Sequence, residues 1–264
     1  MKIELTGKTA VVTGSSSGIG LAIASGLAEC GARTIVNGRK QDAVDSAIER
    51  IKSRVPNADV LGIACDLGTL SGVEAVVKEA PETDILVNNM GFFGPGDILS
   101  TADADWERYF QVNVMSGVRM TRAYLAGMMK RRWGRIVFIS SESGVAIPPD
   151  MLAYGFTKTA QLSISRGVAK FAANSGVTVN SVLPGPTLSE GALEMVSATA
   201  KAEGKTSEQV LNDFVVKTRG SSIIRRATTT EEVANMVVYV CSPQASATTG
   251  AALRVEGGIV DSIS

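Results

Sequence analysis

Apolar and β-branched residues gather in short runs that recur along the chain, and most of these runs are bounded by glycine or asparagine. A short apolar run between turn-forming residues predicts a strand that is buried on both faces. The segments predicted as strands are 9–13, 34–37, 60–65, 85–88, 135–140, 177–183 and 252–255.

Between these runs, apolar residues recur at the spacing of helices that cover a core. The segments predicted as helices are 19–29, 42–54, 71–79, 105–129, 153–173 and 231–241. This alternation predicts an α/β fold, a doubly wound parallel sheet of about seven strands with helices on both faces. Because no repeat, low-complexity tract or linker interrupts the pattern, we expect residues 1–264 to form a single domain.

One segment, at about residues 187–225, breaks the alternation. It is rich in alanine, glutamate and lysine, and Thr206 and Gln209 have the spacing of a capping box, which predicts a short helix. The segment is too long for an ordinary connection, and it follows a strand end, where open α/β sheets bind ligands. We therefore expect an insertion that acts as a mobile lid over a substrate.

Charge and composition restrict the function. Lysine and arginine total 26, as do aspartate and glutamate, so no net charge favours nucleic acid or an anionic membrane, and we expect a small-molecule partner. No run approaches the roughly 20 apolar residues of a membrane span, and the first residues read directly into a strand, so we expect a cytoplasmic protein. Histidine is absent, which leaves tyrosine, lysine, cysteine or a carboxylate for proton transfer.

The cysteines give no sign of a metal site. Cys30, Cys65 and Cys241 are far apart in the sequence and form no CxxC pair. This spacing favours reduced, buried thiols over disulfides or zinc ligands, so we expect no metal.

A glycine-rich loop follows the first predicted strand and opens the first predicted helix. Glycine allows a tight turn there, and the free amides at the helix N-terminus can bind a pyrophosphate, which indicates a Rossmann-type sheet. The predicted cofactor-binding residues of this loop are Gly14, Ser16, Ser17, Gly18, Ile19 and Gly20.

The end of the second strand bears on the choice between NAD and NADP. A carboxylate at this position accepts hydrogen bonds from a free ribose hydroxyl and repels a 2′-phosphate. Here the strand ends in Asn37-Gly38-Arg39-Lys40, with no acid. The guanidinium of Arg39 suits a phosphate, so we predict NADP(H). The alternative is that Arg39 and Lys40 only begin a solvated helix.

Tyr154 and Lys158 begin a predicted helix. The spacing of four residues places the phenol and the ammonium on one helix face. An unperturbed tyrosine has a pKa of about 10, and a nearby cation favours the phenolate, which brings the group closer to the range needed for proton exchange with a hydroxyl.

Taken together, these motifs resemble the single-domain short-chain dehydrogenase/reductase family, including its 3-oxoacyl reductase-like members, over essentially residues 5–258. Only segment 188–225 lies outside the resemblance in detail. The resemblance implies an oxidoreductase that moves a hydride between NADP(H) and a carbonyl or secondary alcohol. It rests on the order and spacing of loop 13–20, Asn88-Asn89-Met90-Gly91, Asn113, Ser141, Tyr154 with Lys158, and Pro184-Gly185.

The resemblance implies a catalytic role for four residues. Tyr154 is the expected acid/base, and Lys158 is expected to lower its pKa and to hold the ribose hydroxyls. Ser141 is expected to hydrogen-bond the substrate oxygen, with Ser140 as the neighbouring candidate. Asn113 is expected to anchor a water that relays protons to the lysine; the alternative is a residue that only bends the helix.

The resemblance also implies contacts with the cofactor. Asp66 and Leu67 match the pair that meets the adenine, Asn88 the residue near its ribose, and Thr187 the residue that steadies the nicotinamide carboxamide. The alternative for Asn88, and for Asn89, is that they chiefly bond backbone between strands. Met90 stands where the family usually has alanine.

The substrate is less defined. Apolar residues near the expected cleft suggest a largely nonpolar ketone or alcohol, whereas Glu142 and Asp150 either repel an anionic substrate or face water. The apolar residues are Phe92, Phe93, Val145, Ile147, Met151, Leu188 and Met195.

Two alternatives remain for the function. Reduction of 3-oxoacyl groups on acyl carrier protein needs basic contacts, which residues 130–132 offer. The arginine usual in such reductases is replaced here by Ser175. The other alternative is a noncatalytic NADP-binding sensor, which the intact catalytic set disfavours.

Helices 105–129 and 153–173 are apolar on more than one side. This pattern, together with the family resemblance, predicts a homotetramer or homodimer.

Overall fold

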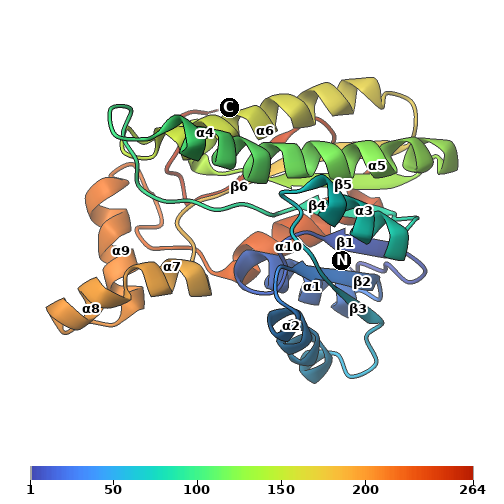
Figure 1. Cartoon of the computed structure of the whole chain (residues 1–264), viewed down its shortest axis with the longest axis horizontal. Coiled ribbons are helices and arrows are strands. Elements are labelled where there is room, and N and C mark those ends of the chain that lie inside the picture. Colours follow the sequence, from blue (N-terminus) through green and yellow to red (C-terminus); the bar gives the residue numbers. More distant parts are fainter. Residues whose placement is uncertain (1, 264) are drawn as a thin grey trace.

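The computed structural model describes residues 2–263 and contains a sheet of seven strands, all parallel, in the order β3-β2-β1-β4-β5-β6-β7 (Figure 1). The prediction of a doubly wound, Rossmann-type sheet is confirmed. The strands are β1 (Thr9–Val12), β2 (Arg33–Gly38), β3 (Val60–Ala64), β4 (Ile85–Asn88), β5 (Gly134–Ile139), β6 (Val177–Pro184) and β7 (Ala252–Val255).

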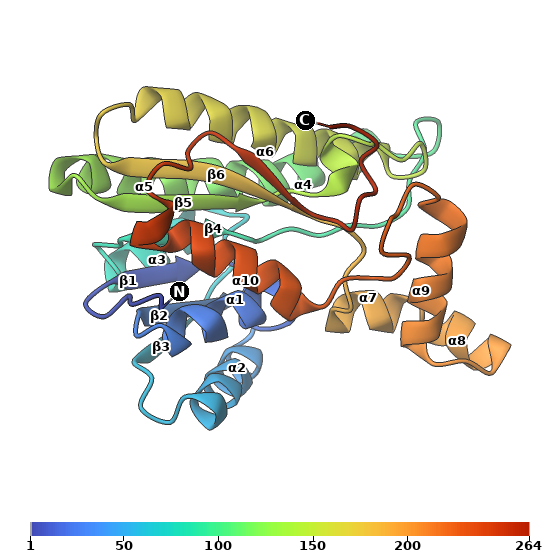
Figure 2. The same cartoon turned by 180° about the vertical axis from the view of Figure 1, so that it is seen from behind.

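Helices cover both faces of the sheet, as Figures 1 and 2 show from opposite sides. One face carries α1 (Gly18–Glu29), α2 (Gln41–Arg54) and α10 (Thr230–Cys241). The other carries α3 (Leu70–Glu79), α5 (Ser116–Arg131) and α6 (Leu152–Phe171). None of the helices within residues 2–263 is long and apolar enough to cross a membrane.

The strands are apolar throughout because their alternate side chains enter two different cores. Val11 and Leu86 pack with α3 and α5, whereas their neighbours Val12 and Val87 pack with α1 and α10. All four side chains are fully buried. The continuous apolar runs in the sequence are therefore the direct consequence of a sheet covered on both sides.

The predicted helix 105–129 is divided in the structure. It consists of α4 (Asp103–Tyr109), a π-helical turn (Phe110–Met115) and α5. The apolar spacing continues across the turn, so the sequence pattern does not reveal the interruption. Single π turns are frequent at functional sites, and this one contains Asn113.

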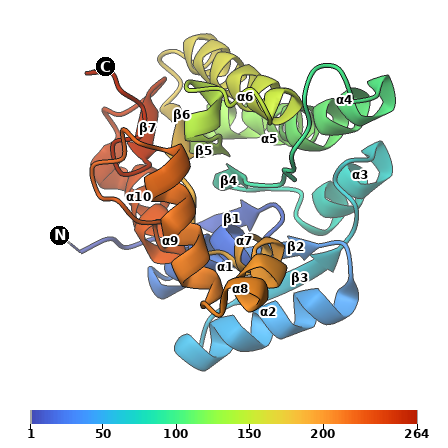
Figure 3. The same cartoon turned by 90° about the vertical axis from the view of Figure 1, so that its left-hand side faces the viewer.

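The insertion at 187–225 contains three helices where the sequence predicted one. These are α7 (Glu190–Met195), α8 (Ser197–Glu203) and α9 (Ser207–Thr218). The capping box predicted from Thr206 and Gln209 is present at the start of α9. Figure 3 shows the three helices grouped together, and Figure 1 shows that they lie at one end of the sheet. They have a small core of their own, formed by Leu211, Val215 and Ala227.

Gly176 provides a test of the connection between α6 and β6. Its φ is +78°, and a Cβ there would lie 2.1 Å from the carbonyl oxygen of Arg132. We expect Gly176→Ala to lower the free energy of unfolding by roughly 1–3 kcal/mol through the backbone conformation alone, and further through the clash. Denaturant unfolding measures the change.

The matched control is Gly167→Ala. Gly167 lies in α6 with nothing within 4 Å of the added Cβ. This substitution should raise the free energy of unfolding by about 0.5–1 kcal/mol, because alanine loses less backbone entropy in a helix. Equal stabilities for the two variants would contradict the role given to Gly176.

Candidate active site

Two asparagines fix the glycine loop at the carboxyl edge of the sheet. Asn37, at the end of β2, accepts a hydrogen bond from the backbone N–H of Gly14 at 3.2 Å. Asn89, after β4, donates to the carbonyl oxygens of Thr13 and Gly14, at 2.9 Å each. A Cβ on Gly20 would lie 2.4 Å from the Gly14 oxygen, so the loop closes tightly on the first turn of α1. The Asn89 side chain thus bonds backbone that follows β1, in line with the alternative given for it.

The sequence did not reveal the role of Asn37. The signal was present, since Asn37 is a polar residue in an otherwise apolar strand and is only 2% exposed. Its side-chain amide also donates to the carbonyl oxygen of Ile63 in β3, at 3.1 Å. One side chain thus joins the glycine loop to two adjacent strands.

The N-terminus of α1 retains donors for an anion. Ser17 is the N-cap residue but its side chain forms no capping bond. Within residues 2–263, the hydroxyls of Ser16 and Ser17 also form no hydrogen bond, and the backbone N–H of Ile19 lies in the first, uncapped turn. These groups belong to the loop residues that were predicted from the sequence to bind the cofactor.

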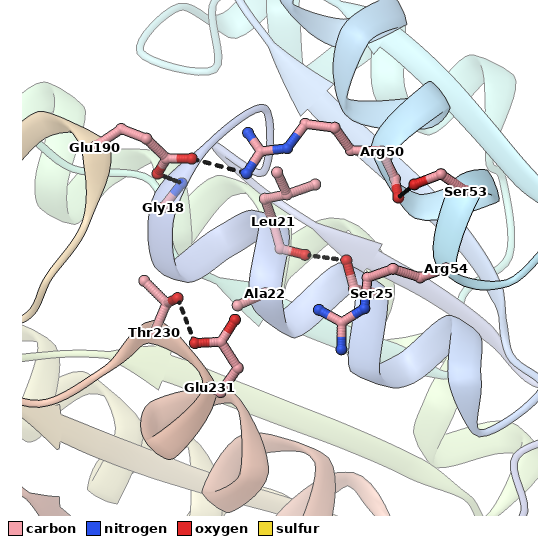
Figure 4. Close-up of a pocket in the computed structure, with 10 residues that line it drawn as sticks. All are labelled: Gly18, Leu21, Ala22, Ser25, Arg50, Ser53, Arg54, Glu190, Thr230 and Glu231. Atoms are coloured by element: carbon pink, nitrogen blue, oxygen red, sulfur yellow. Dashed lines mark hydrogen bonds and ion pairs between the residues drawn. The ribbon is translucent and has the colours of Figure 1, made fainter.

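The backbone N–H of Gly18, in contrast, already has a hydrogen-bond partner within the protein. Its backbone N–H donates to the Glu190 carboxylate of α7 at 2.6 Å, and the same carboxylate pairs with Arg50 of α2 at 2.9 Å. Figure 4 shows these groups around a pocket of about 210 Å³ between α1, α2 and α10. None of the predicted catalytic residues lines this pocket. The contacts of Glu190 with Gly18 and Arg50 connect the insertion to the glycine loop and to α2.

Tyr154 and Lys158 lie on one face of α6, as predicted from their spacing. The Lys158 ammonium is 5.5 Å from the centre of the Tyr154 ring. It donates to the carbonyl oxygen of Ile139 at 2.8 Å and to the side-chain oxygen of Gln161 at 3.3 Å. Lys158 is 4% exposed, so these contacts satisfy a buried cation.

The structure separates the two serine candidates at the end of β5. The Ser140 hydroxyl donates to the backbone oxygen of Lys158 at 2.8 Å, which joins β5 to α6. The Ser141 hydroxyl donates to the carboxylate of Glu142 at 2.5 Å and lies close enough to Tyr154 to affect its pKa. Only Ser141 therefore has its side chain beside the phenol.

Asn113 connects the π turn to the loop after β4. Its side chain accepts from the N–H of Phe92 at 2.9 Å and donates to the Phe92 oxygen at 3.0 Å and to Thr157 at 3.1 Å. Its backbone oxygen accepts from Gln161 at 2.6 Å. Asn113 is thus linked to Lys158 through Gln161, a residue that the sequence analysis missed although it lies three residues after Lys158 on the same helix.

Burial governs the proton affinities of the tyrosine and the lysine. Desolvation raises the pKa of Tyr154, the negative charge of Glu142 raises it further, and the nearby Ser141 hydroxyl acts in the opposite direction. Desolvation lowers the pKa of Lys158 to about 7, against the effect of Glu142. The protein groups together hold Tyr154 in its protonated form, and the lowering of its pKa by Lys158 stays a prediction.

Comparison with known proteins agrees with this geometry. The family model described as enoyl-(acyl carrier protein) reductase matches residues 14–260. The chain belongs to the short-chain dehydrogenase/reductase family. It is accordingly an oxidoreductase that uses a nicotinamide cofactor, and the resemblance inferred from the motifs is confirmed.

Individual members of the family match over the whole chain. An uncharacterized oxidoreductase of Bacillus subtilis, YvaG, is 46% identical over 263 residues, which are 100% of both chains. The 3-oxoacyl-[acyl-carrier-protein] reductase FabG of Rickettsia felis is 30% identical and covers 98% of this chain and 99% of its own. The crystal structure of L-sorbose reductase from Gluconobacter frateurii, complexed with NADPH and L-sorbose, aligns with a TM-score of 0.93, 32% identity and full coverage of both chains.

The residues at the carboxyl edge fit the dinucleotide that members of this family use. The Arg39 side chain is exposed and forms no hydrogen bond or ion pair within residues 2–263. Asn88 donates to Thr121 at 3.2 Å, and its side-chain oxygen is buried with no partner in this part of the chain. A free cation and an unsatisfied acceptor are the groups that a bound ligand would be expected to engage.

Three other residues predicted to contact the cofactor have side chains that are hydrogen-bonded within the protein or buried in its core. The Asp66 carboxylate accepts from the N–H of Gly68 at 2.9 Å, and Leu67 is fully buried in the core, which leaves its backbone for a ligand. The Thr187 hydroxyl bonds the oxygen of Gly185 at 2.8 Å and the Thr228 hydroxyl at 2.9 Å. Their side chains therefore shape the loops around the site.

The surroundings of the phenol are more polar than the sequence suggested. Glu142 does not face water: it is 4% exposed and pairs with Arg219 of the insertion at 3.3 Å. Phe93 packs edge-on against Tyr154 at 6.1 Å between ring centres. Phe92 turns away and stacks on Tyr109, and Leu188 joins the small core of the insertion. The expected nonpolar lining thus includes a buried ion pair.

The lowered pKa of Lys158 predicts a pH dependence of stability. Between about pH 7 and pH 10 the unfolded chain binds a proton on this lysine that the folded chain does not bind. The contribution of Lys158 to the free energy of unfolding should therefore rise with pH across this window, by up to about 1.4 kcal/mol per pH unit, and should be lost as the pH falls through 7. Lys158→Met should remove this contribution and so lower the slope that denaturant unfolding measures without added cofactor.

The control for this measurement is Lys170→Met. Lys170 lies on the same helix and is exposed, so its removal should leave the slope unchanged. Identical slopes for the wild type and Lys158→Met would show that Lys158 is charged in the folded protein.

Proposed function

We propose that this protein reduces the carbonyl group of a small molecule with NADPH, with Tyr154 as the proton donor. The observation that carries the proposal is the convergence of Tyr154, Ser141, Lys158 and Asn113 at the carboxyl edge of the sheet. The glycine loop, with its uncapped helix terminus, lies at the same edge.

The chemistry divides between the cofactor and the protein. NADPH, when bound, supplies the hydride. Tyr154 donates a proton to the carbonyl oxygen, and Ser141 donates a hydrogen bond to the same oxygen as negative charge develops on it. Lys158, linked through Gln161 to Asn113, is the group from which the tyrosine regains a proton.

The proton affinities favour the direction of reduction. Donation to a carbonyl requires a protonated tyrosine, and burial together with Glu142 raises the pKa of Tyr154. The buried lysine, whose pKa is about 7, exchanges protons readily at neutral pH.

Two features support NADPH over NADH. Arg39, at the end of β2, is exposed and unpaired within residues 2–263, and no acid stands at the tip of that strand. A planar guanidinium binds phosphate through two hydrogen bonds. The related L-sorbose reductase was solved with NADPH, which agrees with this assignment.

The insertion at 187–225 fits the role of a substrate lid on a single domain formed by residues 1–264. Glu190 near its start contacts the glycine loop, and Arg219 near its end contacts Glu142 beside Ser141. The insertion thus borders both the cofactor side and the substrate side of the proposed site.

Acyl carrier protein is a less suitable substrate. Of the three basic residues expected to contact it, Arg131 pairs with Glu82 and Asp84 and donates to the carbonyl oxygen of Thr83 at 2.6 Å. Arg132 donates to the Asn174 oxygen. These cations stabilise their own loops, so a small ketone is the preferred substrate.

We also propose that the protein assembles with copies of itself through α4 and α6. Trp106 of α4, Phe110 of the π turn that follows it and Phe156 of α6 form a cluster, in which the Phe156 ring centre is 5.9 Å from that of Trp106 and 6.5 Å from that of Phe110. Phe110 is 38% and Phe156 44% exposed. An exposed aromatic cluster of this kind is typical of an interface between subunits, as in a homodimer or homotetramer.

Removal of the phenol tests the mechanism. Tyr154→Phe should lower kcat by roughly 10²–10⁴-fold, because it removes the proton donor, while NADPH binding persists. The loss of NADPH absorbance with a panel of ketones, diketones, 3-oxoesters and aldehydes measures turnover, and cofactor fluorescence measures binding. Tyr239→Phe, on α10 away from the site, should keep wild-type turnover. Undiminished turnover by Tyr154→Phe would exclude the mechanism.

Charge reversal at Arg39 tests the cofactor assignment. Arg39→Asp should lower the ratio of kcat/KM with NADPH to kcat/KM with NADH by roughly 10- to 100-fold, because it removes hydrogen bonds from a charged donor to the 2′-phosphate. Lys52→Asp makes the same charge change on the exposed side of α2 and should leave the ratio unchanged. Equal ratios in the wild type and Arg39→Asp would support the alternative that Arg39 is only a solvated helix start.

A further inference from the structure

Glu142 is a buried carboxylate directly beside the proposed catalytic serine. Its side chain is 5% exposed; one oxygen accepts from the Ser141 hydroxyl at 2.5 Å, and the other accepts from the Nε of Arg219 at 3.3 Å. Its charge acts on the proton affinities of both Tyr154 and Lys158, so it lies within electrostatic reach of the reacting groups. The mechanism proposed above assigns it no task.

The hydrogen bonds of Ser141 do not allow it to serve two acceptors at once. A serine hydroxyl carries one proton, and here that proton is donated to Glu142. The Ser141 oxygen meanwhile accepts from the N–H of Ser143 at 3.1 Å. When Ser141 turns its proton to a substrate carbonyl, the nearer oxygen of Glu142 loses its donor. A buried carboxylate oxygen without a donor is strongly unfavourable.

The backbone donors next to Glu142 are already in use. The backbone N–H groups of Gly144, Val145 and Ala146 donate to the carbonyl oxygens of residues 141 and 142. The Nε of Arg219 is used by the other Glu142 oxygen, and its Nη1 donates to the oxygen of Thr218. A hydroxyl group of the substrate can supply the replacement.

We propose that Glu142 is a specificity-determining residue, which accepts a hydrogen bond from a hydroxyl group on the carbon next to the substrate carbonyl. This inference rests on the proposed function and names its substrate class as α-hydroxy ketones, which are reduced to vicinal diols. Ser141 and Glu142 are hydrogen-bonded neighbours, so they match two oxygens on adjacent carbons: Ser141 donates to the carbonyl oxygen and Glu142 accepts from the hydroxyl.

The charge of the subsite selects a neutral donor. Arg219 already balances the carboxylate, so a protonated amine next to the carbonyl would add an unbalanced cation close to Lys158. A substrate carboxylate at the same position would be repelled by Glu142 and offers no donor. A hydroxyl group is neutral and also supplies a hydrogen-bond donor.

The insertion completes this subsite. Arg219 is the C-cap residue of α9, and its side chain is 16% exposed. The guanidinium packs over the ring of Phe214 from the same helix, at 5.3 Å from the ring centre. Selection for the hydroxyl therefore depends on the docked position of α9.

Matched substrate pairs test the proposal. The wild-type enzyme is assayed with NADPH on 1-hydroxy-2-butanone against 2-butanone, and on hydroxyacetone against acetone. We expect kcat/KM to be at least about tenfold higher for the hydroxy member of each pair, because a site that binds a substrate hydroxyl discriminates against the analogue that lacks it. Glu142→Ala should reduce this ratio to within about twofold of one, mainly through a higher KM for the hydroxy ketone.

The control is Asp150→Asn, which removes an exposed acid from the loop between Ser141 and Tyr154 and should keep the wild-type ratio. Cofactor fluorescence and thermal unfolding check that each variant is folded. If Glu142→Ala does not fold, Glu142→Gln keeps the shape and replaces the charged acceptor with a weaker neutral one, and the ratio should again fall.

The outcomes distinguish this inference from the proposed function. Reduction of both members of each pair at equal kcat/KM, or an unchanged ratio in a folded Glu142 variant, would overturn the inference and leave carbonyl reduction intact. Equal losses on both members in Glu142→Ala would show a purely structural role and would also overturn it. A wild type that oxidises NADPH with no member of the panel would overturn the proposed function and the inference with it.

Discussion

The parallel pairing of β1 with β4 is the constraint on which the site depends. Val12 lies opposite Val87, so the chain leaves both strands at the same level of the sheet. The two loops that follow approach so closely that a Cβ on Gly14 would lie 3.1 Å from the Cα of Met90. Strand order reverses between these strands, and open α/β sheets bind ligands outside the carboxyl ends of the strands at such a point. The glycine loop therefore lies at this switch point, at the same edge of the sheet as Ser141 and the start of α6.

Several charged side chains are buried at the site, and their burial costs free energy of desolvation. Lys158, Glu142 and the partly buried Arg219 lie close together, and each loses hydration on folding. Hydrogen bonds from Lys158 to Ile139 and Gln161, and the ion pair between Glu142 and Arg219, offset part of this cost. Desolvation that is not offset also changes the proton affinities: it raises the pKa of Tyr154 and lowers that of Lys158. The same burial that destabilises these charges keeps Tyr154 protonated, which is the form that the proposed mechanism needs.

Charged groups join the insertion to the rest of the molecule at both of its ends, beside backbone hydrogen bonds such as those from the N–H groups of Ile223 and Ile224 to the oxygen of Gly257. At its start, Glu190 binds the N–H of Gly18 and Arg50; at its end, Arg219 binds Glu142. Its own apolar residues pack among themselves in a small cluster. The pair of Glu190 with Arg50 is about half exposed, where ion pairs contribute little, whereas the pair with Glu142 is buried. Docking of the insertion and the polarity of the substrate site thus depend on the same carboxylate.

The sequence by itself determined the order of strands and helices, the glycine loop, the capping box of α9 and the spacing of Tyr154 and Lys158, because periodicity, turn chemistry and helix geometry act over a few residues. It did not reveal the π turn at Asn113, since the apolar spacing continues through that turn. Nor did it identify Asn37, Gln161 or the pairing of Glu142 with Arg219, whose partners lie far along the chain or on another element. Only the tertiary structure decided the burial of these groups, and burial sets both the direction of a pKa shift and the partners that a polar side chain needs.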